Sequence, residues 1–207
     1  MTAGARTSPG AAFTAPDEGD PRGDPDARRR VSSHLGISPA WATVEQVHGN
    51  RAVPVGEAGR AGPADGLVTT VPGLPIAVFT ADCLGVVLIA PAAVGVAHAG
   101  WRGLSAGILQ STMDLMERAG SSPVGAYIGP AIGPCCFEVG EEVVALFPED
   151  ATATTWGSPS VDLVGAARRR LDPLPLTVAG RCTACGGGPS HRATGTSVRM
   201  AAIGWIR

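Results

Sequence analysis

The stretch PIAVFTADCLGVVLIAPAAVGVAHAG, residues 75–100, decides the fold of this chain. It contains three apolar, Val-rich runs, separated by polar Asp82–Cys83 and by Pro91. Apolar runs of about four to eight residues between turn formers are typical of strands buried on both faces. The segment from Cys83 to Trp101 has no Asp, Glu or Arg and approaches the length of a membrane span. Because Pro91 and several glycines interrupt it, we expect two buried strands joined by a turn and no transmembrane helix.

The residues before this stretch predict more strands and a loose beginning. Residues 41–48, WATVEQVH, alternate in the manner of a strand, and RAVPV, residues 51–55, is expected to pair with it across a turn at Gly49–Asn50. GLVTT, residues 66–70, is a further apolar run. Residues 1–30 are polar and have no apolar period, which predicts a flexible or loosely packed N-terminal segment.

The residues after the stretch alternate between helical and strand patterns. From Gly103 the apolar period becomes that of a helix that ends near Gly120. The further elements expected are a strand at 124–129, a short helix at 139–147, an arginine-tipped helix at 161–171 and a closing strand at 200–206. We therefore predict an α+β (mixed α/β) fold, with a single catalytic domain over residues 31–207.

Composition excludes several classes of function. All sixteen basic residues of the 207-residue chain are arginine, and the absence of lysine excludes a Walker-A phosphate loop, a pyridoxal Schiff base and a lysine nucleophile. A net charge of −2 and an aromatic content of 4% argue against nucleic-acid and anionic-membrane partners. The N-terminus lacks an apolar signal region, and the odd number of cysteines does not fit a secreted disulfide framework, so we expect a cytoplasmic protein. The oligomeric state cannot be predicted from the sequence.

Three residues at the ends of predicted strands form a candidate metal site: His48 in QVHGN, Cys83 in TADCLG and His98 in AHAGWRG. Two imidazoles and one thiolate suit Zn²⁺ or copper, and three protein ligands leave a tetrahedral position open, as in catalytic sites. Taken one by one, a lone buried cysteine or histidine is more often a packed core residue than a metal ligand. Spacing alone leaves both interpretations open.

The motifs around these residues add a resemblance. QVHGN, ADGLVTTVPGLPIAVFTADCLGVVL, HAGWRG and IGPAIGPCCFEVGEEV occur in this order over roughly residues 41–147. Together they closely resemble the YfiH-like family, also named the laccase-domain or multicopper polyphenol oxidoreductase family, with a weaker match at CTAC…SHR…RMA. The resemblance implies a layered α/β/β/α sandwich and one Zn²⁺ per chain on His48, Cys83 and His98. It also implies purine-nucleoside chemistry: phosphorolysis of adenosine, inosine or methylthioadenosine, or deamination of adenosine.

Neighbouring polar residues are candidates for catalysis and substrate binding. Cys83 and Arg102 are expected at the reacting centre, where a planar, permanently charged arginine suits phosphate or a developing anion. Asp82 could accept a hydrogen bond from a ligand imidazole, act as a general base or cap a turn. Either Gln46 or Asn50 is expected to contact a base edge or ribose, and Arg192 to reach the substrate. Asp65 could be a turn residue or a functional one.

The other four cysteines receive a structural interpretation. Loop packing is favoured for Cys135 and Cys136 over a role at the pocket mouth. Cys182 and Cys185 form a CxxC motif, which can bind zinc or act in redox chemistry. No second pair with zinc-finger spacing follows, and the resemblance implies no second metal there.

Three departures from the family pattern bear on specificity. The family's N-terminal loop is missing, Gly85 stands where the family has proline and is expected to loosen the turn after Cys83, and Val198–Arg199 replaces a Gly-Arg pair.

Three other functions stay open. The first is a copper-dependent polyphenol oxidase, which is a weak interpretation because several coppers need more ligands than the four histidines of this chain. The others are a cysteine-type amidohydrolase that edits peptidoglycan precursors and a metal-stabilised binding module.

Overall fold

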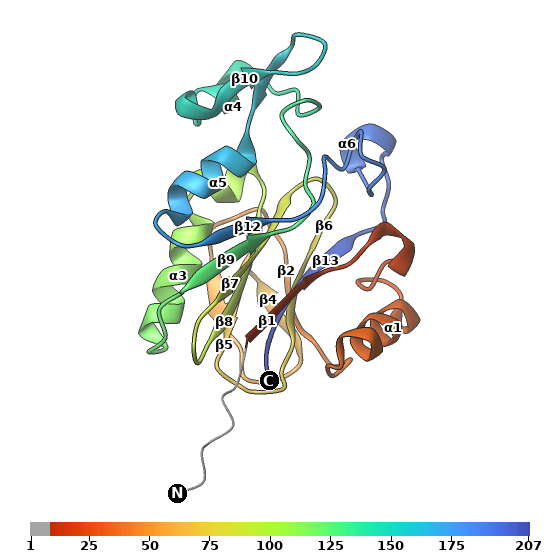
Figure 1. Ribbon diagram of the computed structural model, residues 1–207, viewed down its shortest axis with the longest axis vertical. Coiled ribbons are helices and arrows are strands. Elements are labelled where there is room, and N and C mark those ends of the chain that lie inside the picture. Colours follow the sequence, from red (N-terminus) through yellow and green to blue (C-terminus); the bar gives the residue numbers. More distant parts are fainter. Residues whose placement is uncertain (1–8) are drawn as a thin grey trace, which may run out of the picture.

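Two β-sheets packed face to face form the centre of the computed structural model, which describes residues 9–207 (Figure 1). The five-stranded sheet has the order β1 (Pro9–Phe13), β13 (Met200–Ile206), β6 (Ile76–Thr80), β2 (Ala42–Glu45), β4 (Gly59–Pro63). The six-stranded sheet has the order β12 (Leu176–Val178), β9 (Gly125–Ile128), β7 (Leu84–Ile89), β8 (Val94–Ala99), β5 (Gly66–Thr69), β3 (Ala52–Pro54). A separate pair is formed by β10 (Ala151–Ala153) and β11 (Pro159–Val161).

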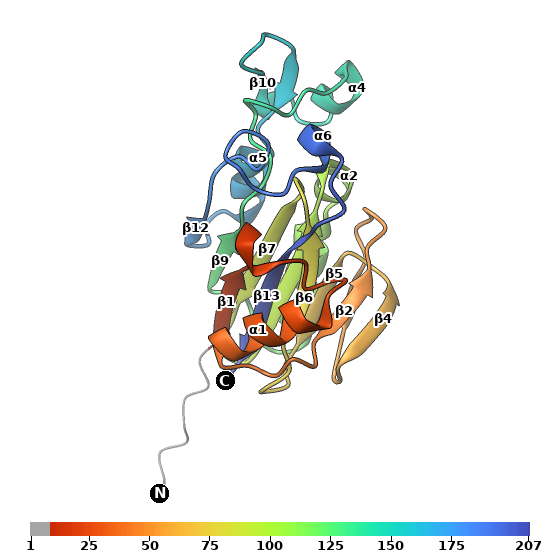
Figure 2. The same ribbon diagram turned by 90° about the vertical axis from the view of Figure 1, so that its right-hand side faces the viewer.

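Helices cover the outer faces of the two sheets. The helix α1 (Pro25–Leu35) lies on the five-stranded sheet, and α3 (Ile108–Arg118) and α5 (Leu163–Leu171) lie on the other side of the molecule (Figures 1 and 2). The predicted α/β/β/α sandwich is therefore confirmed. The shorter helical segments are η1 (Pro16–Glu18), α2 (Trp101–Ser105), α4 (Glu141–Val144), η2 (Pro148–Asp150) and α6 (His191–Thr194).

The alternation in β13 shows why this sequence builds two layers. Ala202 and Ile206 pack with residues of both sheets in the central core. The intervening residues, Ile203 and Trp205, pack with Val31 of α1 on the outer face. Since successive side chains of a strand point to opposite faces, one strand contributes to two cores.

The strands β7 and β8 confirm the predicted hairpin, with Leu84 opposite Ala99 and Ile89 opposite Val94. Among residues 9–207, no helix is both long and apolar enough to cross a membrane. Gly85 lies within β7, where an added Cβ would be 2.7 Å from the Cβ of Ala202 in the facing sheet. The expectation of a loosened turn was wrong, because Gly85 lies within a strand and, in this chain, its missing Cβ leaves room for Ala202.

The predicted pairing of residues 41–48 with 51–55 was also wrong. The strand β2 pairs with β4 and β6 in one sheet, whereas β3 pairs with β5 in the other. Residues 46–51 therefore cross between the sheets instead of forming a hairpin turn, and this crossing carries His48.

The described part of the N-terminal segment is not loose. All five residues of β1 pair antiparallel with β13, and α1 begins at Pro25 with Asp24 as its N-cap. Residues 1–8 lie outside the described residues. Pairing with a sheet edge uses main-chain hydrogen bonds, so the side chains of the short run PGAAF carry no clear pattern from which this strand could be predicted.

Two expected helices are shorter or divided. The helix expected after Gly103 is two helices, α2 and α3, separated by Gly107 at a φ of 93°. The helix expected at 139–147 has only one turn, α4.

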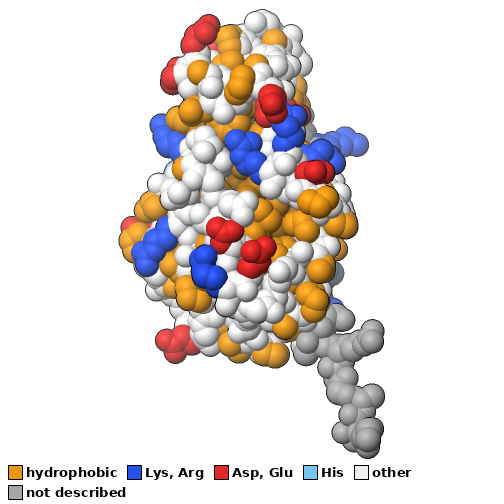
Figure 3. Space-filling view, turned by 90° about the vertical axis from the view of Figure 1, so that its left-hand side faces the viewer, with side chains coloured by type: hydrophobic (Ala, Val, Ile, Leu, Met, Phe, Trp, Pro, Cys, Tyr) orange, Lys and Arg blue, Asp and Glu red, His pale blue; other side chains and the backbone are white. Residues whose placement is uncertain are grey.

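On the face that carries α3 and α5, arginine side chains form a band below a projecting end of the molecule (Figure 3).

Candidate metal centre

The three predicted ligands meet at one end of the sandwich. His48 comes from the crossing between β2 and β3, Cys83 from the turn between β6 and β7, and His98 from β8. Their ligand atoms all lie within 4.8 Å of one another, and the two imidazole centroids are 4.8 Å apart at 73°. His98 is buried, Cys83 is half-buried and His48 is exposed, so the cluster opens toward solvent on one side.

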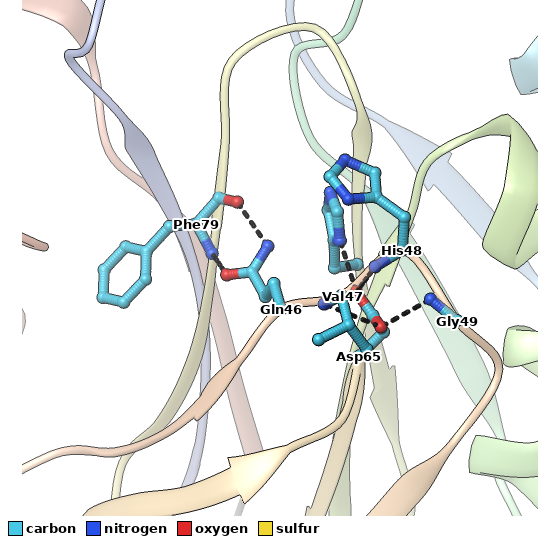
Figure 4. A network of polar contacts seen from close by, with 7 residues as sticks. Gln46, Val47, His48, Gly49, Asp65 and Phe79 are labelled. Atoms are coloured by element: carbon cyan, nitrogen blue, oxygen red, sulfur yellow. Dashed lines mark hydrogen bonds and ion pairs between the residues drawn. The ribbon is translucent and has the colours of Figure 1, made fainter.

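A buried carboxylate, Asp65, organises this cluster (Figure 4). It accepts hydrogen bonds from the backbone N–H groups of Val47, His48 and Gly49, at 3.2, 3.0 and 2.7 Å. It also accepts from Nδ1 of His98 at 2.7 Å. Because a carboxylate can only accept here, the proton of His98 sits on Nδ1 and Nε2 is left to face a metal. Of the two interpretations of Asp65, the structure favours the functional one.

Backbone conformation makes room for the ligands. His48 and Asp82 have φ values of 60° and 89°, although neither is glycine. Such conformations cost energy and tend to gather at functional sites. At Gly100, in HAGWRG, a Cβ would lie 3.0 Å from Sγ of Cys83 and 3.3 Å from Cδ2 of His48. The glycine therefore lets the chain pass close to two ligands.

The ionisable groups of the centre stabilise one another in charged form. Burial opposes ionisation of the Cys83 thiol, but hydrogen bonds to His48 and His98 outweigh it and lower its pKa to about 6. Burial likewise opposes the charge on His98, and its contacts with Asp65 and Cys83 raise its pKa to about 9. Hydrogen bonds from His98 and the backbone overcome burial to lower the pKa of Asp65. A thiolate and two imidazoles, one of them fixed by a carboxylate, fit the ligand preferences of Zn²⁺ and copper.

The centre lies in a cavity of about 810 Å³ with a strongly cationic lining. Among the described residues, Asp82 is the one carboxylate that lines the cavity. Six arginines also line it: Arg22, Arg28, Arg60, Arg102, Arg192 and Arg199. The guanidinium of Arg102 stacks 4.2 Å from the ring centroid of Trp101. It makes no hydrogen bond or ion pair with any residue between 9 and 207, unlike the other five. Arg102 is thus available to an anionic ligand.

Asp82 does not contact a ligand imidazole. Its carboxylate accepts from Oγ1 of Thr183 at 2.6 Å and from the backbone N–H of Arg192 at 2.7 Å. The role of imidazole acceptor, considered for Asp82 from the sequence, is held by Asp65. Asp82 instead joins the turn that carries Cys83 to the loop after β12 and to the start of α6.

The two amides expected near a substrate are bonded to the backbone. Both amide atoms of Gln46 pair with the N–H and C=O of Phe79 at 2.8 Å, which extends the sheet past the end of β2 (Figure 4). Nδ2 of Asn50 donates to the carbonyl of Ala106 at 2.8 Å. Gln46 lines the cavity but Asn50 is absent from its lining. Their geometry is that of residues that position the His48 loop.

Arg192 lines the cavity, and its contact with a substrate stays a prediction. Its guanidinium donates to the carbonyl of Glu138 and lies 5.4 Å from the ring centroid of Phe137. It therefore forms part of a wall built with the loop that follows β9.

Comparison with known proteins agrees with this architecture. The sequence profile of a family described as multi-copper polyphenol oxidoreductase laccase matches residues 17–207. A Streptomyces griseus protein named purine nucleoside phosphorylase ORF3 is 36% identical over 196 residues, which cover 86% of this chain and 80% of the relative. Purine nucleoside phosphorylase YfiH of Escherichia coli is 36% identical over 195 residues, with 86% and 79% covered.

Two solved structures share the fold across nearly the whole chain. The hypothetical protein YfiH of Bacillus licheniformis superposes with a TM-score of 0.86 at 26% identity, covering 99% of this chain and 98% of that one. YlmD of Geobacillus stearothermophilus gives 0.85 at 29% identity, with 100% and 98% covered. With its sequence profile, its relatives and its fold in agreement, the chain belongs to the multicopper polyphenol oxidoreductase laccase family, the family of YfiH.

Proposed function

We propose that this protein is a zinc-dependent enzyme that acts on purine nucleosides, with phosphorolysis as the favoured reaction. The observation that carries the proposal is the position of the His48, Cys83 and His98 cluster in a cavity lined by arginines. The names of the relatives, purine nucleoside phosphorylases, support the substrate class.

The metal would be held by Nε2 of His98, the Cys83 thiolate and the imidazole of His48. A zinc ion bound there supplies Lewis-acid chemistry and makes water nucleophilic at neutral pH. Asp65 keeps His98 in the tautomer that presents Nε2. Asp82 and Arg192 act at the cavity wall, and Gln46 and Asn50 position the His48 loop from outside the reacting centre.

The cationic lining favours phosphorolysis over deamination. Phosphorolysis needs phosphate: its oxygen forms a bond to C1′ of the ribose as the bond from C1′ to the base nitrogen breaks, and the departing base takes a proton. Deamination of adenosine needs only water. Arginine binds phosphate with paired, charge-assisted hydrogen bonds, and this chain has no lysine to share the task. Arg102, with its guanidinium uncommitted among the described residues, is the proposed phosphate ligand.

Incubation of zinc-loaded protein with adenosine, inosine or methylthioadenosine, with and without phosphate, tests this function. We expect free base and ribose 1-phosphate, or its methylthio analogue, by chromatography only when phosphate is present. Inosine formed from adenosine without phosphate would identify a deaminase instead. No product from any of the three substrates would contradict the proposal.

The substitution Arg102→Ala tests the phosphate ligand. Loss of one charge-assisted hydrogen bond, about 1.5–3 kcal/mol, predicts a KM for phosphate raised roughly 10- to 100-fold. The KM for nucleoside should change much less. Arg118→Ala, at the end of α3 and away from the cavity, is the matched control and should leave both constants unchanged. An unchanged KM for phosphate in Arg102→Ala would assign the anion to another arginine.

A second candidate rests on the low pKa of Cys83. A thiolate beside two imidazoles is also the arrangement of a nucleophilic cysteine, which suits a cysteine-type amidohydrolase. A covalent acyl adduct trapped on Cys83 would favour this reaction. Copper chemistry on phenols requires copper in the purified protein, and metal analysis separates it from the zinc proposal.

A further inference from the structure

Four cysteines outside the candidate centre lie together at one edge of the six-stranded sheet. Cys135 and Cys136 follow β9, and Cys182 and Cys185 follow β12. The strands β9 and β12 are parallel neighbours, with Ala126 opposite Leu176 and Ile128 opposite Val178 (Figure 1). Parallel neighbours end at the same edge of a sheet, so the two following loops emerge side by side. Tertiary structure thus joins two cysteine pairs that are far apart in the sequence.

The spacing of the sulfur atoms fits a single metal ion. All four Sγ atoms lie within 4.8 Å of one another, and those of Cys135 and Cys185 are 3.8 Å apart. Zinc–sulfur bonds of about 2.3 Å in a tetrahedron place the sulfurs about 3.8 Å from one another. All four thiols are free. The N–H of Gly133 donates to Sγ of Cys182 at 3.2 Å, and such backbone donors stabilise metal-bound thiolates.

We propose that Cys135, Cys136, Cys182 and Cys185 bind a second zinc ion. Four thiolates complete the tetrahedral coordination and leave no position for water or substrate, so this is a structural site. It differs in kind from the His48, Cys83 and His98 cluster, which has three ligands and borders the cavity. No second pair follows the CxxC motif at zinc-finger spacing, but the fold supplies one from earlier in the chain, Cys135 and Cys136 on the loop after β9.

The zinc ion would brace the wall of the cavity. Phe137 and Glu138, which contact the guanidinium of Arg192, directly follow Cys136. Thr183, between Cys182 and Cys185, donates a hydrogen bond to Asp82 in the turn that carries Cys83. One ion would therefore hold two loops that shape the cavity without touching its reacting centre.

Metal counting tests the proposal without any activity measurement, and the Cys83→Ser variant separates it from the proposed zinc centre of the enzyme, because that variant keeps only the four-cysteine site complete. The wild-type chain, purified with zinc under reducing conditions and free of chelator, should contain about two zinc ions by mass spectrometry of the metal. Cys182→Ser and Cys83→Ser should each contain about one, because each variant removes a ligand from a different site. Cys83→Ser is thus the matched control for thiol loss.

Cobalt substitution identifies the ligands of the remaining ion and does not require Cys182→Ser to fold. Co²⁺ bound to Cys83→Ser should show the intense thiolate charge-transfer and ligand-field bands of four-sulfur coordination. Absence of zinc from folded Cys83→Ser, which keeps all four cysteines of the proposed site, would overturn the proposal. So would two zinc ions retained in folded Cys182→Ser, or a Cys182–Cys185 disulfide recovered from the reduced preparation.

Discussion

Replacement of Asp65 by asparagine tests whether one buried carboxylate holds the ligand loop and fixes His98. One carboxylate oxygen accepts from the N–H of His48 and from Nδ1 of His98, and the other accepts from the N–H groups of Val47 and Gly49. Asparagine keeps one acceptor oxygen and places an NH₂ group where the second was. Whichever way its amide turns, two donors lose their acceptor and face another donor.

The size of the effect follows from these four contacts. A hydrogen bond to a charged group contributes about 1.5–3 kcal/mol net, and two are lost at a fully buried position. Because the four share one group and are not additive, we expect the free energy of unfolding to fall by about 3–5 kcal/mol. Loss of a hydrogen-bond partner behind a metal-ligating histidine typically lowers metal affinity by about 10- to 100-fold. Zinc affinity should fall by that factor.

Urea unfolding of metal-free and zinc-loaded protein measures the free energy of unfolding, and competition with a chromophoric chelator measures the zinc affinity. Asp82→Asn is the matched control: it is also a buried carboxylate with two hydrogen bonds, but none to a ligand. It should lose stability and keep its zinc affinity at the His48, Cys83 and His98 cluster. If folded Asp65→Asn binds zinc there as tightly as wild type, the reasoning about Asp65 is refuted.

Two further predictions concern single residues of the hairpin region. In metal-free protein, the rate at which iodoacetamide alkylates Cys83 should be half-maximal near pH 6, because the thiolate reacts and the pKa of the thiol is lowered from 9.0 to about 6. Peptide mass spectrometry measures the alkylation rate at each pH. A midpoint near pH 9 would show that the imidazoles do not stabilise the thiolate. Gly85→Ala should lower the free energy of unfolding by about 1–3 kcal/mol, because the new Cβ would lie 2.7 Å from the Cβ of Ala202. Thermal unfolding measures this loss. Adding Ala202→Gly to the same chain should restore part of the lost stability, and no restoration would contradict the assignment of the loss to this contact.

Much of the core fold was predictable because its signals are local. The apolar runs at residues 76–80, 84–89 and 94–99 became β6, β7 and β8, and the helical period after Gly103 became α2 and α3. The candidate ligand cluster of His48, Cys83 and His98 was predictable because each residue ends or follows a strand within a motif of several residues. Pairing between distant segments was less accessible: β2 and β3, close in sequence, joined different sheets.

By itself, the sequence determined a mixed α/β fold, the three candidate ligands and the need for arginine to meet any anion, because period, motif and composition are properties of the chain; its resemblance to the YfiH-like family implied the layered sandwich. Only the tertiary structure decided what the remaining polar groups do. In the folded chain, His98 donates its hydrogen bond to Asp65 and not to Asp82. The amides of Gln46 and Asn50 bond to the backbone. Cys135 and Cys136 lie beside the two cysteines of the CxxC motif. The physical reason is that hydrogen bonds and metal ligands act over a few ångströms, and the pairing of the strands together with the course of the loops sets which distant residues come that close.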